Sequence, residues 1–112
     1  MKSIRIGLIG TGFMGKTHLW SVKNLPFFYK TAELGFTAEV AAVATSRPES
    51  AEAGAREFDI PRFCTEEEML CDPTIDVIDI CTPNPCHYET AKRAILAGKH
   101  VLCEKPLCDT WV

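Results

Sequence analysis

Short apolar runs alternate along this chain with segments whose apolar residues recur at helical spacing. The runs expected to form strands are residues 4–9, 40–44, 62–64, 75–81 and 101–103. Strands that read as apolar runs between helices are typical of βαβ units, in which helices cover both faces of a parallel sheet. The pattern therefore predicts an α/β fold, a Rossmann-type doubly wound parallel sheet of about five strands. Asp76 and Asp79 interrupt the fourth run.

Helices are expected between these strands. The first covers about residues 13–24, and a second begins near Pro48, a residue favoured in the first turn of a helix. Thr65 and Glu68 have the spacing of a capping box, which predicts the start of a brief acidic helix. The last helix is the clearest by periodicity and is expected to stop at Gly98.

Residues 25–37 form a longer connection than a βα repeat usually needs. This segment contains Pro26-Phe27-Phe28-Tyr29, a concentration of aromatic side chains. We expect these aromatics to pack on the edge of the sheet. The alternative is a lid or a subunit contact formed by exposed aromatics.

Composition narrows the class of protein. The chain has 112 residues and a formal net charge of -3, so it supports one small domain with one core and offers no basic surface for nucleic acid. No apolar run approaches the roughly 20 residues that span a bilayer, and no secretory signal precedes the first strand. We therefore expect a cytoplasmic protein that binds neither nucleic acid nor a membrane.

Six cysteines, at positions 64, 71, 81, 86, 103 and 108, contain no Cys-x-x-Cys pair, the usual spacing of metal ligands on a tight turn. Cys81 and Cys103 fall within or at the ends of predicted strands, where a thiol packs like a small apolar side chain. We expect free thiols and no metal. Zinc binding is the alternative.

The sequence Gly-Thr-Gly-Phe-Met-Gly at residues 10–15 follows the first predicted strand directly and opens a helix. In this context Gly10 permits a tight turn, Gly12 leaves room for a pyrophosphate, and Gly15 lets the helix pack close to the strand. Unpaired amides at the start of the helix then attract the anion. The motif predicts a dinucleotide site; a glycine-rich turn that binds nothing is the alternative.

The residues that follow the second strand bear on the choice of dinucleotide. An acidic residue there would receive the ribose hydroxyls of NAD, but this chain has Thr45, Ser46 and Arg47. Two hydroxyls and a guanidinium suit a phosphate dianion, which favours NADP over NAD. The alternative is that Ser46 caps the following helix and Arg47 points to solvent.

Glu104-Lys105-Pro106 leaves the carboxyl end of the last predicted strand, on the edge where ligands bind in open α/β sheets. A lysine beside a cofactor of low dielectric can have its pKa lowered enough for acid–base chemistry, and an ammonium can donate the proton that accompanies hydride transfer to a carbonyl. Lys105 is therefore the candidate catalytic residue. On spacing alone, a solvated surface lysine is the alternative.

The chain resembles the amino-terminal domain of the glucose–fructose oxidoreductase / inositol dehydrogenase (Gfo/Idh/MocA) family over nearly its whole length. The similarity lies in the block at residues 7–18, in Cys-Thr-Pro-Asn at 81–84, in His87, and in Ala-Gly-Lys-His-Val-Leu-Cys-Glu-Lys-Pro-Leu at 97–107. The resemblance implies an NAD(P)-dependent oxidoreductase that acts on a sugar, a polyol or a related carbonyl/alcohol pair.

The resemblance also implies roles for individual residues. Besides the second-strand residues above, the cofactor-binding set that it implies is Gly10, Gly12, Phe13, Met14, Gly15, Thr82, Pro83, Asn84, His87, Glu104 and Lys105. Thr82, Pro83 and Asn84 would line the adenosine and pyrophosphate side of the cleft. Glu104 would fix the loop, Lys105 would lie near the nicotinamide and the substrate, and Pro106 would rigidify the turn. Helix-start packing is the alternative role for His87.

Members of the resembled family continue into a second α/β domain that contributes substrate contacts and a partner for the lysine. We therefore expect residues 1–112 to form a single, truncated dinucleotide-binding domain that is inactive alone and whose unfinished sheet edge can pair with a second copy. A non-catalytic dinucleotide-binding module and a self-associating fragment without activity are the alternative functions.

Overall fold

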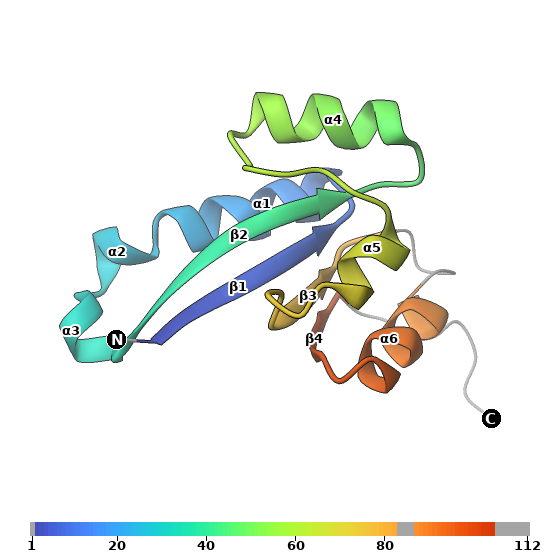
Figure 1. Cartoon of the computed structure of the whole chain (residues 1–112). Coiled ribbons are helices and arrows are strands. Elements are labelled where there is room, and N and C mark those ends of the chain that lie inside the picture. The colour runs from blue at the N-terminus through green and yellow to red at the C-terminus, as the bar shows by residue number, and fades with distance from the viewer. Residues whose placement is uncertain (1, 83–86, 105–112) are drawn as a thin grey trace.

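Four parallel strands form one sheet in the part of the chain that the computed structural model describes, residues 2–82 and 87–104 (Figure 1). The strands are β1 (Lys2–Ile9), β2 (Phe36–Ala44), β3 (Val77–Ile80) and β4 (His100–Cys103). They lie in the order β2-β1-β3-β4, and each neighbouring pair is parallel. The predicted α/β fold with a doubly wound parallel sheet is confirmed.

The predicted strand at residues 62–64 is reduced to one β-bridge. Phe63 bridges Val43 at the outer edge of β2, where the Val43 amide donates to the Arg62 carbonyl and the Cys64 amide donates to the Val43 carbonyl, each at 3.0 Å. The segment cannot extend further as a strand, because Pro61 precedes it and the next helix begins directly after Thr65.

The described helices are α1 (Phe13–Lys23), α2 (Leu25–Phe28), α3 (Thr31–Leu34), α4 (Pro48–Glu57), α5 (Glu66–Cys71) and α6 (His87–Leu96). Four of these six helices lie where the sequence places them, and α2 and α3 form within the 25–37 segment, which was expected to be a connection. The predicted capping box holds the start of α5, since the Glu68 amide donates to Thr65 Oγ1 and the Thr65 amide donates to Glu68 Oε1. Gly98, with φ of +82°, follows α6 in the left-handed conformation that ends a helix.

None of the described helices is long and apolar enough to cross a membrane.

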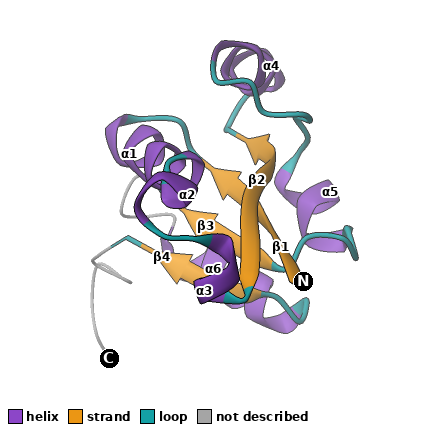
Figure 2. Cartoon of the chain, turned by 90° about the vertical axis from the view of Figure 1, so that its left-hand side faces the viewer, coloured by secondary structure: helices purple, strands orange, loops and turns teal. Residues whose placement is uncertain are grey.

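Two apolar cores cover opposite faces of the sheet (Figure 2). On one face, Leu8 and Val43 pack with Leu19 of α1 and Ala55 of α4. On the other face, residues of β1, β2 and β3 pack with α5 and α6, and Met69 of α5 is fully buried there. Burial of both faces explains why the central strands read as continuous apolar runs.

β1 and β2 extend beyond the other two strands as a two-stranded ribbon (Figure 1). They pair from Lys2 and Phe36 onward, whereas β3 joins β1 only from Ile6. The ribbon is joined across its strands by an ion pair between Arg5 and Glu39 at 2.6 Å. In residues 36–39, the first half of β2, exposed residues alternate with partly buried ones, so the sequence has no continuous apolar run in this part of the strand.

The expectation that the aromatics of the 25–37 segment pack on the sheet edge is wrong. Phe27, Phe28 and Tyr29 are 82%, 63% and 54% exposed. Phe28 contacts Trp20 of α1 and Phe27, with ring centroids 6.4 Å and 5.1 Å apart. The short helix α2 begins directly after α1 and continues away from the sheet, so its aromatics pack on one another and on α1 instead (Figure 1).

Candidate functional site

The turn between β1 and α1 is shaped by glycines. Gly10 has φ of +99°, and a Cβ there would lie 2.7 Å from the Cys81 carbonyl oxygen, so only glycine fits without strain. A Cβ at Gly15 would lie 2.2 Å from the Gly10 carbonyl oxygen. These contacts are the tight turn and the close helix packing that the motif predicts.

Gly12 differs from the other two glycines of the turn. A Cβ placed there would meet no atom of the described chain within 4 Å, so the space beside it is open. Gly12 is the N-cap of α1, and the first turn of this helix carries no acidic residue. The amides of that turn have no partner within the helix and face a region without a competing carboxylate of their own helix. The position therefore suits an anion.

A hollow of about 660 Å³ opens beside this turn at the carboxyl ends of the strands. The predicted site residues that line it are Gly10, Gly12, Phe13, Met14, Thr45, Ser46, Thr82, His87 and Glu104. β2 and β3 lie on opposite sides of β1, so the chain reverses direction across the sheet at this point. Ligands of open α/β sheets bind at such a reversal.

The remaining predicted site residues are placed differently. Gly15 packs beneath the turn, and Arg47 is exposed at the start of α4. Pro83, Asn84 and Lys105 lie outside the described residues.

A second hollow, of about 440 Å³, adjoins the first and shares Thr45, Ser46 and Glu66 with it. Thr45 Oγ1 donates to the Arg47 carbonyl at 2.7 Å and contacts the Ser50 hydroxyl. The N-cap of α4 is Arg47, without a side-chain capping bond, so Ser46 does not cap this helix. Ser46 and Arg47 are both exposed.

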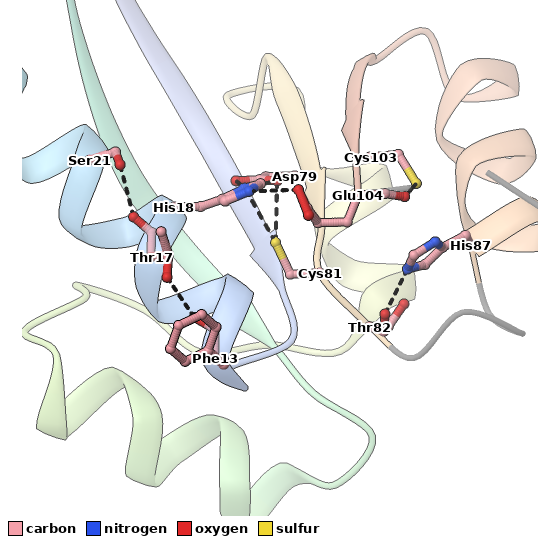
Figure 3. Close-up of polar contacts among 10 residues, drawn as sticks. All are labelled: Phe13, Thr17, His18, Ser21, Asp79, Cys81, Thr82, His87, Cys103 and Glu104. Atoms are coloured by element: carbon pink, nitrogen blue, oxygen red, sulfur yellow. Dashed lines mark hydrogen bonds and ion pairs between the residues drawn. The ribbon is translucent and has the colours of Figure 1, made fainter. Parts of the chain in front are cut away.

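Thr82 and His87 form the wall beyond β3. His87 is 1% exposed, and its Nε2–H donates to the Thr82 carbonyl at 2.6 Å, because a carbonyl can only accept (Figure 3). This bond fits a packing role for His87 at the start of α6, but His87 also lines the hollow, so its part in cofactor binding stays a prediction. The Thr82 hydroxyl is buried and has no hydrogen-bond partner among the described residues. A buried hydroxyl beside a hollow can hydrogen-bond a ligand there.

A histidine of α1 joins two carboxylates under the hollow (Figure 3). His18 Nδ1 lies 2.9 Å from each carboxylate oxygen of Asp79, and its Nε2 lies 3.1 Å from Glu104 Oε2. Asp79 is 2% exposed on β3, and Glu104 directly follows β4. Carboxylate oxygens accept, so an imidazolium with a proton on each nitrogen satisfies both contacts.

In this cluster, burial and the neighbouring charged groups shift the pKa values of His18 and Asp79 in opposite directions. Burial alone would lower the pKa of His18, but the hydrogen bonds and charges of Asp79 and Glu104 together raise it above the usual value. Burial raises the pKa of Asp79, and the hydrogen bond from His18 acts against that rise. Burial and the Asp79 charge raise the pKa of the Cys81 thiol strongly, so this cysteine stays protonated.

His18, Asp79 and Cys81 are also the one group of described residues that could together hold a metal ion, with ligand atoms within 4.8 Å of one another. The three groups are already in contact, since Cys81 Sγ lies 3.4 Å from His18 Nδ1 and donates to Asp79 Oδ1 at 3.5 Å. A metal would have to displace these bonds and take a proton from a thiol of raised pKa. The expectation that the chain binds no metal stays a prediction.

The carboxylates that line the hollow are paired with cationic groups. Glu66 lies 3.5 Å from the Arg93 guanidinium of α6, and Glu104 lies 3.1 Å from His18. Pairing reduces the negative potential that two free carboxylates would present to an anion. The hollow thus combines an amide-lined turn with neutralised acidic walls.

Comparison with known proteins agrees with this geometry. A family model described as "Oxidoreductase family, NAD-binding Rossmann fold" (GFO_IDH_MocA) matches residues 4–112. The chain belongs to this Gfo/Idh/MocA family.

The matches to individual relatives show what share of a family member's length this chain covers. Levoglucosan dehydrogenase of Pseudarthrobacter phenanthrenivorans is 40% identical over 98% of this chain and 28% of its own length. Inositol 2-dehydrogenase of Pseudomonas savastanoi is 30% identical over 96% of this chain and 30% of its own. A solved structure of levoglucosan dehydrogenase in complex with NADH and L-sorbose superposes with a TM-score of 0.89 at 39% identity, covering 96% of this chain and 29% of that one. The chain thus spans less than a third of these relatives.

The Gfo/Idh/MocA resemblance included His18 in its first block of residues, but sequence reasoning gave neither His18 nor Asp79 a place in the site. A signal for Asp79 was present, since it is a carboxylate within an otherwise apolar strand. A buried charge needs a partner. No sequence spacing pointed to His18 as that partner, because 61 residues separate the two.

The glycine contacts predict a difference in stability between two substitutions. Gly15→Ala should lower the free energy of unfolding by about 1–3 kcal/mol or more, because the new methyl group meets the Gly10 carbonyl oxygen. Gly12→Ala should cost less than about 1 kcal/mol, because its methyl group enters open space. Urea unfolding followed by circular dichroism measures both. Equal midpoints for the two variants would contradict the packing described for α1.

Proposed function

We propose that this chain is the cofactor-binding part of an NAD(P)-dependent oxidoreductase that transfers hydride between a nicotinamide and a sugar, a polyol or a related carbonyl/alcohol substrate. The activity and the substrate class are proposals because the chain spans less than a third of its relatives. Family membership supports the reaction class, and the printed names of the relatives, levoglucosan dehydrogenase and inositol 2-dehydrogenase, support the substrate class.

The observation that carries the proposal is the open space beside Gly12. Unlike Gly10 and Gly15, this glycine is not required by the protein's own packing. Its lack of a side chain does leave room for a diphosphate to reach the amides at the start of α1. Thr82, whose buried hydroxyl has no partner among the described residues, lines the same hollow.

The strand order supports one direction for the bound cofactor. With the diphosphate at α1, the adenosine half extends toward the end of β2, where Thr45, Ser46 and the second hollow lie. The nicotinamide half then extends the other way, over the ends of β3 and β4, toward Glu104. The two halves thus occupy opposite ends of the continuous depression.

We propose NADP rather than NAD as the preferred cofactor. Ser46 and Arg47 are exposed at the end of β2, so both side chains are available to a 2′-phosphate. The acidic residues that line the second hollow are Glu66, Glu67 and Glu68. Glu66 and Glu67 contact Arg93, which weakens their repulsion of the phosphate, and Glu68 accepts from the Thr65 amide. Levoglucosan dehydrogenase was solved in complex with NADH, so the comparisons support a nicotinamide dinucleotide, and the preference for NADP is our proposal.

Lys105 is proposed as the acid–base residue. When bound, the nicotinamide ring supplies or receives the hydride. A lysine beside it would deliver the proton to the substrate oxygen in reduction and remove it in oxidation. Lys105 directly follows Glu104 in the sequence, and Glu104 lines the hollow. A cytoplasmic location and self-association stay predictions from the sequence.

Gly12→Val tests the cofactor site. The isopropyl group would fill the space that a diphosphate needs, so NADPH and NADH binding, followed by nicotinamide fluorescence, should be lost. Ala53→Val, at an exposed position of α4, adds the same kind of bulk elsewhere and should bind as the unsubstituted chain does. Retained affinity in Gly12→Val would refute the proposed site.

Arg47→Ala tests the cofactor preference. Loss of the guanidinium should weaken NADPH binding by about tenfold or more and leave NADH binding nearly unchanged, because only NADPH carries the 2′-phosphate. Arg56→Ala is the matched control, since Arg56 is an exposed arginine of the same helix. An equal loss for both cofactors would remove the support for NADP.

Lys105→Ala tests the chemistry. The dissociation constant of this chain for NADPH should change little. In the full-length enzyme, where a second domain would contribute the substrate contacts, turnover over a panel that includes levoglucosan and myo-inositol should fall by about 10²–10⁴-fold. Turnover that survives the substitution would show the assignment of Lys105 to be wrong. Binding without turnover in the unsubstituted full-length protein would instead favour the non-catalytic dinucleotide-binding module.

A further inference from the structure

His18 occupies an unusual position for a residue of a cofactor-binding helix. It lies on α1 between a buried carboxylate of the sheet, Asp79, and a carboxylate of the hollow's wall, Glu104 (Figure 3). The side chains of Asp79, His18 and Glu104 are 2%, 17% and 28% exposed. The three groups thus lead from the core to the surface that the proposed cofactor would contact.

We propose that His18 is a positioning residue that, as an imidazolium anchored on Asp79, holds the Glu104 carboxylate in place and offsets its charge toward a bound dinucleotide. The proposal rests on the proposed function, because it assigns His18 a part in the same site.

The anchoring follows from where each group is attached. Asp79 is paired with Leu8 in the middle of the sheet and cannot move without disturbing β1 and β3. Both carboxylate oxygens of Asp79 lie 2.9 Å from His18 Nδ1, and this contact fixes the orientation of the imidazole ring. Nε2 is then directed at Glu104, whose own amide is fixed by a bond to the Ile80 carbonyl at 3.1 Å. The ring therefore determines where the Glu104 carboxylate lies.

The charge effect follows from the groups that face the ring. Among the residues that the structure describes, these are Asp79 and the Cys81 thiol at the end of β3 and Glu104 at the end of β4. The nearest lysine on α1, Lys16, has its ammonium over the Phe58 ring instead. With an imidazolium the cluster carries one net negative charge, and with a neutral imidazole it carries two. The second state would repel a dinucleotide more strongly.

The direction of the pH effect follows from the raised pKa of His18. The proton is held more tightly in the folded chain than in the unfolded chain, so the stabilisation is complete below the usual histidine pKa of about 6.5. It is lost as the pH rises through the folded value. Dinucleotide affinity should fall over the same interval.

NADH is the suitable probe because it lacks the 2′-phosphate, which itself titrates near pH 6. For the full chain, the NADH dissociation constant should rise by about tenfold between pH 6 and pH 9. The midpoint of this change should coincide with the titration of the His18 ring protons observed by NMR. His100→Gln, which removes an exposed histidine from β4, should retain the whole profile.

His18→Gln should bind NADH about tenfold more weakly than the unsubstituted chain at pH 6 and show no such change with pH. Adding Glu104→Gln should restore most of that loss, because it removes the charge that His18 no longer offsets. A purely structural role would not give such restoration. If His18→Gln does not fold, as judged by circular dichroism, the pH profiles of the unsubstituted chain and His100→Gln decide the question.

The outcomes separate the two proposals. NADH binding that is independent of His18 protonation, or a double variant as weak as His18→Gln, would overturn the positioning role and leave the proposed function standing. Failure of the unsubstituted chain to bind either NADH or NADPH would overturn the proposed function and the role of His18 with it.

Discussion

The close approach of α1 to the turn after β1 is the constraint on which the site depends. There is no room for a Cβ at Gly15, where one would lie 2.2 Å from the Gly10 carbonyl oxygen and 3.6 Å from Cys81 Cβ. Residues three apart share a helix face, so His18 follows Gly15 toward β3. The same approach that aims the helix amides at the hollow therefore also brings the imidazole within 2.9 Å of Asp79. A larger residue at position 15 would disturb both at once.

Electrostatic compensation is the second theme of the site. Carboxylates repel a polyanionic ligand, yet Glu66 and Glu104 both line the hollow. Glu66 is held by Arg93 of α6, and Glu104 is held by His18 of α1, which is cationic when it is protonated. The arrangement lets a carboxylate orient neighbouring groups without presenting its full charge. It also links the two helices, which cover opposite faces of the sheet, to the same binding region.

The sequence was informative where one physical effect dominated locally. Because both faces of the sheet are buried, the central strands could be predicted from their apolar runs. Because a side chain at Gly10 or Gly15 would clash with the backbone, these glycines could be predicted to form a turn and a packing contact. It misled where packing depended on the direction of a helix, as for Phe27 and Phe28, whose apolar character gave no sign that α2 leaves the sheet. The cluster around His18 was missed because its members come from three elements far apart in the chain. Only the fold brings them together.

The two-stranded ribbon formed by the first halves of β1 and β2 gives the molecule ends of unequal rigidity. At the other end, four strands and helices on both faces secure the backbone, whereas in the ribbon each strand has only one neighbour among the described residues. Local opening is easiest where few backbone bonds and little buried surface must be given up. The ribbon can therefore fray and re-form as a unit, while the opposite end, where the glycine turn lies, keeps its shape.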